Sequence, residues 1–377
     1  MQTDTSFGFF DKTRSGAKLD DYNYPLPEDK IARYPLQNRD DAKMLVLDRQ
    51  TGRIVHTQFK ALSHYLQPGD LMVLNNTKVL PARFLGCRQG HTGTVEVFLL
   101  HPDNTKNETQ TGRHVWSALL RPARKLKPGT IITLANTDAR LEILSVGNRG
   151  NGRVGVHLTP SAPSVEALME SFGHMPIPPY LNRNAEETDK TRYQTVFSTV
   201  PGAQAAPTAG LHFTPELLVQ LKDQGVNQAA VTLAVSAGTF RTVDTADITA
   251  HHMDPEWYDC PSETTRAVQL AKQKKQRILA IGTTVAKTLE SIAAGHGEAF
   301  SESESPRPYQ DWSQLYIYPG FQFKTIDALL TNFHLPKSTL LMLVSAFCKR
   351  HYVAGAYQAA LENNYRFFSY GDCMLII

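Results

Sequence analysis

The hydrophobic pattern of this 377-residue chain changes character near residue 160. Between Pro68 and about Pro160, short apolar or alternating runs recur between Pro-Gly, Asn-Thr and Gly-rich turns, without a helical period. These runs span residues 71–74, 84–87, 94–100, 114–120, 130–134, 140–144 and 153–158. The pattern predicts an all-β module, either a small barrel or a sandwich.

Beyond Ser161 the pattern becomes an alternation of helical and strand-like segments. The expected helices span 164–172, 214–223, 262–275, 284–294, 337–348 and 351–363, and the expected strands span 229–235, 277–281, 314–318, 326–330 and 373–377. Upstream, residues 43–48 and 53–56 have the pattern of a strand pair, followed by a short helix over 59–66. Such an alternation is typical of a parallel α/β layer or barrel.

Together these patterns predict an α/β protein with a barrel-like body and an inserted small all-β barrel domain. We expect a discontinuous α/β domain over residues 19–66 and 161–377, interrupted by the β-barrel domain over 67–160. The polar residues 1–18 predict a loose tail, and the acidic, Ser-rich residues 294–311 predict a disordered loop.

The composition excludes several classes of protein. Hydrophobic residues make up 41% of the chain and charged residues 20%, as in ordinary globular proteins, and the formal net charge is only +3. The longest apolar run, 340–348, is far too short for a membrane span, and no secretory signal is visible. The four cysteines are widely separated, and no cluster has metal-ligand spacing. We therefore expect a cytoplasmic protein with no bound metal and no membrane contact, and we take it to be a monomer.

The segment 206–214 (APTAGLHFT) can form a tight turn that leads into a helix. Thr214 and Pro215 have the pattern of an N-cap and a first helical residue, so that backbone N–H groups would face the loop. His212 lies in this turn, and a histidine beside a helix N-terminus can bind an anion or move a proton. A structural turn with a buried, hydrogen-bonded histidine explains the same residues equally well.

A second candidate segment covers residues 277–291, where an apolar strand leads into Gly282, Thr283 and Thr284 and then an amphipathic helix. This order places backbone donors and two hydroxyls at the C-terminal end of a strand, where α/β proteins bind ligands. The segment has neither Walker A spacing nor the three glycines of a dinucleotide fingerprint, and an ordinary strand-to-helix turn is the alternative.

Polar residues also precede two buried elements near the C-terminus. Asn332 and His334 lie in the connection before a strongly apolar helix, either as the wall of a site or as a cap. Asp372 precedes the terminal strand, where it either binds a ribose, orients a histidine or closes a turn.

The β module carries interleaved cations that could contact the phosphates of a nucleic acid. The candidates are Lys78, Arg83, Arg121, Arg124 and Lys125. A solvated charged face is the alternative.

Taken in order, the motifs of the chain closely resemble one known family. The matching motifs are PGDLMVLNNTKVLPARFLG, GHMPIPPYLNR, GAQAAPTAGLHFT, VTLAVSAGTF, AIGTT, YIYPGFQFK, DALLTNFHLPKSTLLMLVSAF and YRFFSYGDCMLI. The sequence is similar to the S-adenosylmethionine:tRNA ribosyltransferase-isomerase family of queuosine biosynthesis enzymes, from about Asp21 to Ile377.

The resemblance implies an α/β body with an inserted β barrel, and it implies a reaction. The ribosyl part of S-adenosylmethionine would be transferred to the aminomethyl-deazaguanine base at the wobble position of a tRNA and rearranged, giving epoxyqueuosine with release of adenine and methionine. S-adenosylmethionine would be a co-substrate, with no prosthetic group, and the anticodon loop of the tRNA would be the partner.

The chemistry of that reaction suggests roles for residues in the matching segments. A base must remove a C–H next to the sulfonium and an acid must assist adenine, and we expect His212 and His334 in these roles, with Asp372 as an orienting residue or a ribose contact. The expected substrate contacts, from backbone donors, hydroxyls, aromatic faces and a carboxylate, are Thr208, Gly210, Phe213, Thr239, Phe240, Glu256, Gly282, Thr283, Thr284, Tyr318, Asn332 and Phe333.

The chain departs from the family pattern at four positions. Ala234 stands for a histidine, Ser236 for a glycine, Asp254 for a histidine and Lys287 for an arginine. Lysine cannot reproduce the bidentate contact of a guanidinium, and serine adds a Cβ that would crowd a ligand. These changes keep open a related enzyme with another acceptor or adenosyl substrate, and a catalytically inactive RNA-binding protein.

Overall fold

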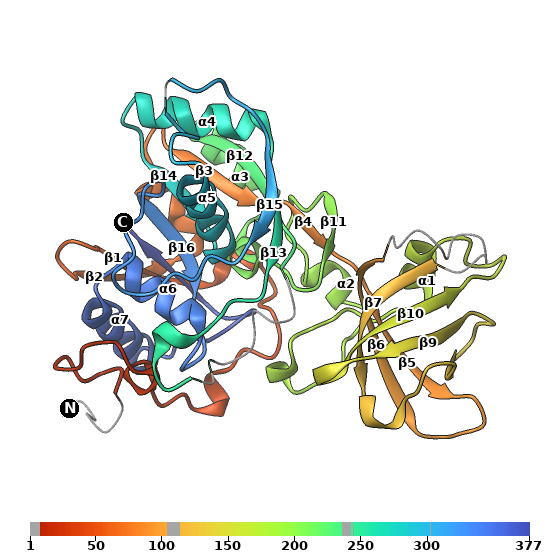
Figure 1. The fold of residues 1–377 in the computed structure, drawn as a ribbon. Coiled ribbons are helices and arrows are strands. Elements are labelled where there is room, and N and C mark those ends of the chain that lie inside the picture. Colours follow the sequence, from red (N-terminus) through yellow and green to blue (C-terminus); the bar gives the residue numbers. More distant parts are fainter. Residues whose placement is uncertain (1–7, 104–113, 236–242, 244, 302) are drawn as a thin grey trace.

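The computed structural model describes residues 8–103, 114–235, 243, 245–301 and 303–377. Figure 1 shows a larger body, built from both ends of the chain, beside a smaller lobe of yellow and orange strands. A parallel two-stranded sheet of β4 (Thr77–Val79) and β11 (Val200–Ala203) lies between the body and the smaller lobe. The predicted fold class, an α/β body with an inserted all-β barrel, is confirmed.

The body contains a nine-stranded mixed sheet in the order β15-β13-β12-β3-β14-β16-β17-β1-β2. Its strands are β1 (Lys43–Leu47), β2 (Ile54–Gln58), β3 (Leu71–Asn75), β12 (Asn227–Leu233), β13 (Glu256–Cys260), β14 (Ile278–Ile281), β15 (Tyr309–Ser313), β16 (Ala328–Asn332) and β17 (Cys373–Ile376). Four neighbouring strands, β12, β3, β14 and β16, run parallel at its centre. The sheet ends at β15 and β2, so the body is an open layer and not a closed barrel.

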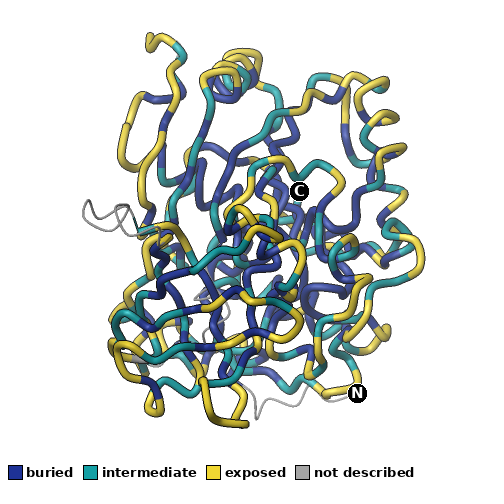
Figure 2. The backbone as a smooth tube through the Cα atoms, turned by 90° about the vertical axis from the view of Figure 1, so that its right-hand side faces the viewer, coloured by how far each residue is buried: buried dark blue, intermediate teal, exposed yellow. Residues whose placement is uncertain are grey.

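Helices cover both faces of this sheet, and its central strands are therefore buried on both sides. In β3, Leu71 and Val73 pack on one face while Met72 and Leu74 pack on the other, as the period of two requires. The helices are α2 (Asp189–Arg192), α3 (Pro215–Asp223), α4 (Ser262–Gln273), α5 (Thr283–Gly295), α6 (Thr339–Phe347) and α7 (Arg350–Glu362). The core with Leu71 contains α4 to α7, and the core with Met72 contains α3 and the 3-10 helix 59–65. In Figure 2 the buried backbone concentrates inside the body.

The smaller lobe is a closed barrel in the order β10-β7-β6-β5-β8-β9. Its strands are β5 (Arg83–Arg88), β6 (Thr94–Pro102), β7 (His114–Arg121), β8 (Ile131–Leu134), β9 (Arg140–Val146) and β10 (Asn151–His157). Helix α1 (Val165–Phe172) packs on the barrel core through Val165, Leu168 and Met169.

Several expectations from the sequence need correction. Residues 71–74, assigned to the β module, form β3 at the centre of the large sheet. The strand expected at 314–318 is absent, and the strand of this region is β15, which ends at Ser313. In the acidic segment 294–311, the described residues are held in place, because Gln269 Nε2 donates to the carbonyl oxygens of Ala299 and Glu304.

The expected loose tail is also wrong for residues 8–18. Phe9 is fully buried among aromatic rings, with the Tyr357 ring 5.5 Å away and the Tyr24 ring 5.8 Å away. Arg350 donates to the carbonyl oxygens of Gly8, Phe9, Asp11, Arg14 and Asp21, which fixes the segment on α7. The first seven residues lie outside the described part.

Candidate functional site

Polar residues collect at the carboxyl ends of the central parallel strands. Asn75 ends β3, Gly282 follows β14, and Asn332 ends β16 two residues before His334. Parallel strands place these ends at one edge of the sheet, the usual position of ligand sites in open α/β folds.

Two adjoining hollows lie at this edge. They share Thr208, Asn332, His334 and Leu340, and together we call them the cleft. The cleft is further lined by Tyr180, Phe333, Leu335, Ser338, Phe368 and Ser369 on one side and by Ala206, Pro207, Ala209, Val235, Gly282, Thr283, Thr284 and Thr331 on the other. Seven of the lining residues carry a hydroxyl, one carries an amide and one an imidazole, and the others are apolar or glycine.

The N-terminus of α5 forms one wall of the cleft. Gly282 precedes the helix with φ +92° and ψ 157°, a backbone conformation that is essentially restricted to glycine. The first N–H groups of α5 and the hydroxyls of Thr283 and Thr284 are therefore available to an anionic ligand group. Buried Asn75 holds the Thr284 hydroxyl, with Nδ2 3.4 Å from Oγ1.

A hydrogen-bonded pair forms the middle of the cleft. Thr208 Oγ1 donates to Asn332 Oδ1 at 2.8 Å, and Asn332 Nδ2 donates to the Phe368 carbonyl at 3.0 Å. These bonds fix the orientation of the buried amide. The hydroxyl and amide are suited to hold the hydroxyl groups of a sugar.

His334 is the ionisable residue shared by both hollows, and it is only 8% exposed. Its Nε2 lies 2.7 Å from Thr331 Oγ1, and Nδ1 has no hydrogen-bond partner among the described residues. Its backbone is clamped, because the N–H donates to Tyr357 Oη and the carbonyl accepts from Tyr24 Oη. Burial lowers the pKa of His334 to about 3, so the imidazole is neutral at pH 7.

This burial makes the stability of the protein sensitive to acid. The unfolded chain protonates position 334 below about pH 6.5, whereas the folded chain does not until about pH 3, so stability decreases as the pH falls through this interval. At pH 5, protonation of position 334 in the unfolded chain should lower the free energy of unfolding by about 2 kcal/mol. Urea denaturation at pH 7 and pH 5 gives the free energy of unfolding at each pH. The decrease between the two pH values should be about 2 kcal/mol smaller in His334→Asn than in the wild type. The exposed control His64→Asn should keep the wild-type pH dependence; an equal change in both variants would contradict the assignment.

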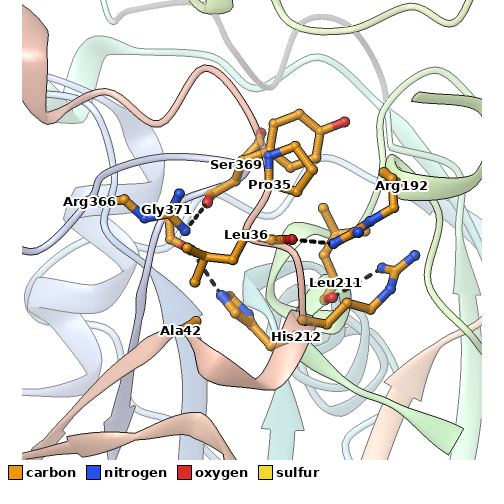
Figure 3. Close-up of a pocket in the computed structure, with 11 residues that line it drawn as sticks. Pro35, Leu36, Ala42, Arg192, Leu211, His212, Arg366, Ser369 and Gly371 are labelled. Carbon is orange, nitrogen blue, oxygen red and sulfur yellow. Dashed lines mark hydrogen bonds between the residues drawn. The ribbon is translucent and has the colours of Figure 1, made fainter. Parts of the chain in front are cut away.

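His212 lies outside the cleft, in a separate hollow (Figure 3). Its Nε2 lies 2.9 Å from the Gly371 carbonyl oxygen and its Nδ1 lies 3.2 Å from that of Ala209. Both ring nitrogens are thus covered by backbone oxygens, and burial lowers the pKa of His212. The structure does not bring the two predicted catalytic histidines into one site: His334 lines the cleft and His212 does not.

Three other expected site residues have structural contacts. Asp372 accepts from the backbone N–H groups of Lys43 at 2.9 Å and Arg366 at 2.7 Å, which closes the turn before β17. A Cβ on Gly210 would lie 2.7 Å from Phe197 Cζ, so this glycine is required by packing. Phe213 is fully buried in the core beneath the sheet. None of the three lines the cleft.

Glu256 is a buried partner of Lys287. The Lys287 ammonium lies 2.8 Å from Glu256 Oε2, and both side chains are below one-tenth exposed. The departure at Lys287 therefore keeps a buried cation opposite this carboxylate, and neither residue lines the cleft. Tyr318 packs against Tyr316, with ring centres 4.9 Å apart, and does not line the cleft either.

The other residues singled out in the sequence lie in different places. Phe333 lines the cleft and is fully buried, and Ala234 adjoins the cleft residue Val235. Asp254 is exposed on the segment before β13. Thr239, Phe240 and Ser236 lie outside the described residues.

Some of the cations expected to form a phosphate-binding face on the β module lie against a carboxylate. Arg83 Nε donates to Glu96 Oε2 at 2.8 Å, and Arg121 lies opposite Glu96 in the β6–β7 ladder. Lys78, Arg121, Arg124 and Lys125 are exposed.

Sequence reasoning missed several residues that line the cleft, and it also missed Asn75 beside it. Asn75 follows an apolar strand and opens an Asn-Asn-Thr turn, which is a usable signal. Thr331 precedes Asn332 in a segment already singled out. Tyr180 and Ser369, whose hydroxyls are hydrogen-bonded to one another, come from segments 189 residues apart, and no local signal pairs them.

Two further findings concern the described residues. They contain no group of three or more His, Cys, Asp and Glu side chains placed to hold a metal ion. In the same part of the chain, every helix is too short or too polar to cross a membrane.

The open sheet, the cleft at its carboxyl strand ends and the inserted barrel define an α/β protein with an all-β insertion. A family model described as "Queuosine biosynthesis protein" matches residues 19–376, and the chain belongs to this family.

Named relatives cover almost the whole chain. Proteins named S-adenosylmethionine:tRNA ribosyltransferase-isomerase from Natranaerobius thermophilus and a Sulfurihydrogenibium species are 43% and 44% identical, covering 95% and 96% of this chain and 99% and 100% of their own. A crystal structure of S-adenosylmethionine tRNA ribosyltransferase from Thermotoga maritima is 35% identical, covers 94% of this chain and 99% of its own, and gives a TM-score of 0.52.

Proposed function

We propose that this protein is an S-adenosylmethionine-dependent tRNA ribosyltransferase-isomerase of queuosine biosynthesis. In this reaction the ribosyl part of S-adenosylmethionine moves to the aminomethyl-deazaguanine base at the tRNA wobble position and isomerises to give epoxyqueuosine, while adenine and methionine leave. The observation that carries the proposal is the cleft around Thr208, Asn332 and His334, in a chain more than 40% identical to relatives of that name.

The two walls of the cleft fit the two ends of S-adenosylmethionine. The N-terminus of α5 would hold the methionine carboxylate, because its N–H groups and dipole favour an anion. Thr208 and Asn332 would hold the ribose hydroxyls. The Tyr180 and Phe368 rings, whose centres lie 4.8 Å apart with their planes tilted by 55°, would offer an aromatic face to a nucleobase.

His334 would act as the base of the reaction. Its neutral imidazole would remove a proton from the carbon next to the sulfonium, which the adjacent positive charge makes acidic. The imidazolium formed in this step could then donate its proton to the departing adenine. Thr331 Oγ1, hydrogen-bonded to Nε2, would keep the ring oriented with Nδ1 free for this exchange.

A product assay tests the proposal directly. Purified protein is incubated with S-adenosylmethionine and tRNA carrying the deazaguanine precursor, and we expect stoichiometric release of adenine and methionine with modification of the tRNA. Turnover with another acceptor only would indicate a related enzyme, to which the departures at Ala234 and Asp254 would then be relevant. Tight, salt-dependent tRNA binding without turnover would indicate an inactive RNA-binding protein.

A further inference from the structure

The hollow that contains His212 is surrounded by arginines. Its lining includes Arg39, Arg192 and Arg366 together with Leu36 and Ser369. Figure 3 shows Arg192 and Arg366 on two sides of this hollow, with His212 below them. We call it the arginine hollow.

The three guanidinium groups are held in place by backbone oxygens. Arg39 donates to the carbonyls of Thr191, Gln194 and Leu211. These hydrogen bonds connect the segment of Arg39 to the segments of Thr191 and Leu211 around the hollow. Carbonyl bonds fix these groups without neutralising their charge, so the positive charge remains available to a ligand.

Arg192 has unused donors in this position. It donates only to the carbonyls of Leu36 and Gln37, through two of its five N–H groups. Its Nε is buried without a hydrogen-bond partner among the described residues. The second N–H of Nη1 and of Nη2 is not used within the described residues and can donate to a ligand.

The positive charges of these arginines are also incompletely balanced by neighbouring carboxylates. Among the described residues, neither Arg39 nor Arg192 forms a salt bridge with a carboxylate, and Arg366 approaches only Asp372, at 4.0 Å. Burial, and then the charge of Arg192, lower the pKa of Arg39. Two mutually repelling cations without an acid partner favour a bound anion.

The rim of the hollow presents an exposed aromatic ring, whose hydroxyl donates to Glu186 at 2.9 Å, and Arg183 beside it is paired with Asp189 at 2.7 Å. Tyr34 is 51% exposed, its carbonyl accepts from Arg366, and the Arg183 guanidinium lies over its ring at 4.3 Å. An exposed aromatic ring beside arginines is suited to stack a nucleobase, which a small carboxylic acid would not require. Ser369 lines both the arginine hollow and the cleft, so a group bound in one lies next to the other.

We propose that the arginine hollow binds a backbone phosphate of the tRNA, held by Arg39, Arg192 and Arg366, and thereby places the neighbouring nucleotide at the cleft. This inference rests on the proposed function, which makes tRNA the substrate. Planar guanidinium groups match phosphate oxygens with paired N–H donors.

The test compares Arg192→Gln with a matched control, Arg350→Gln. Arg350 also donates only to backbone carbonyls, but it lies at the N-terminal segment away from the hollow. Binding of an unmodified tRNA transcript is measured by fluorescence anisotropy between 50 and 200 mM salt, the range over which phosphate contacts are sensitive. We expect Arg192→Gln to weaken binding about tenfold and to reduce the slope of log K against log salt by about 0.7 to 1.

Arg350→Gln should leave that slope unchanged, even where it lowers the melting temperature. An unchanged slope in Arg192→Gln, or equal changes in both variants, would overturn the proposal. So would a raised KM for S-adenosylmethionine with unchanged tRNA affinity, because the hollow would then hold the carboxylate of the small substrate. Since tRNA affinity is measured without turnover, a failure of the arginine hollow is distinguishable from a failure of the proposed reaction.

Discussion

Replacing His334 with alanine should lower the rate of adenine release at least about 10²-fold, the usual contribution of a general base. The imidazole is the ionisable side chain shared by both hollows of the cleft, and burial keeps it neutral with a pKa of about 3. The loss should appear in kcat more than in the KM for S-adenosylmethionine, because a base acts on the transition state.

The variant is informative because it should keep its local backbone. The hydrogen bonds of residue 334 to Tyr24 and Tyr357 involve its carbonyl and N–H, which alanine retains. Single-turnover measurements with saturating tRNA separate the chemical step from product release. His64→Ala, at an exposed position far from residue 334 in the sequence, should react at the wild-type rate. A near-normal rate in His334→Ala would remove this residue from the mechanism.

The sequence presented His212 and His334 as equivalent candidates, and only the folded chain separates them. Both lie in polar connections that precede a helix, so local pattern cannot rank them. The carbonyl that covers His212 Nε2 belongs to Gly371, 159 residues away. Contacts over such separations follow from strand order and not from spacing along the chain.

The same reason explains which elements of the fold were predicted. Periodicity located most helices and strands within a few residues, because burial of one face imposes a local period. It did not assign the run 71–74 to the correct sheet, although this continuous apolar run is typical of a strand buried on both faces, because the neighbouring β runs along the chain were taken as its partners. The polar composition of residues 1–18 concealed two phenylalanines that are buried in the body.

The second large effect is expected at Phe9, in the segment that composition assigns to a loose tail. Phe9→Ala should lower the free energy of unfolding by about 3 to 5 kcal/mol, the range for emptying a buried aromatic site. The ring is fully buried and packs on Tyr22, Tyr24 and Tyr357, so the cavity would be enclosed by large side chains that cannot collapse into it. Urea denaturation at pH 7 measures the change, and Trp312→Ala, at a site 57% exposed, should stay within about 0.5 kcal/mol.

This substitution also links the N-terminal segment to the candidate site. Tyr24 and Tyr357, on which Phe9 packs, are the residues whose hydroxyls clamp the backbone of His334. A cavity beneath them should loosen the clamp, so Phe9→Ala should lose kcat even at temperatures where it remains folded. A Phe9→Leu variant refills part of the cavity and should recover both stability and rate. Unfolding within 1 kcal/mol of wild type for Phe9→Ala would show that residues 8–18 do not pack on the body in solution.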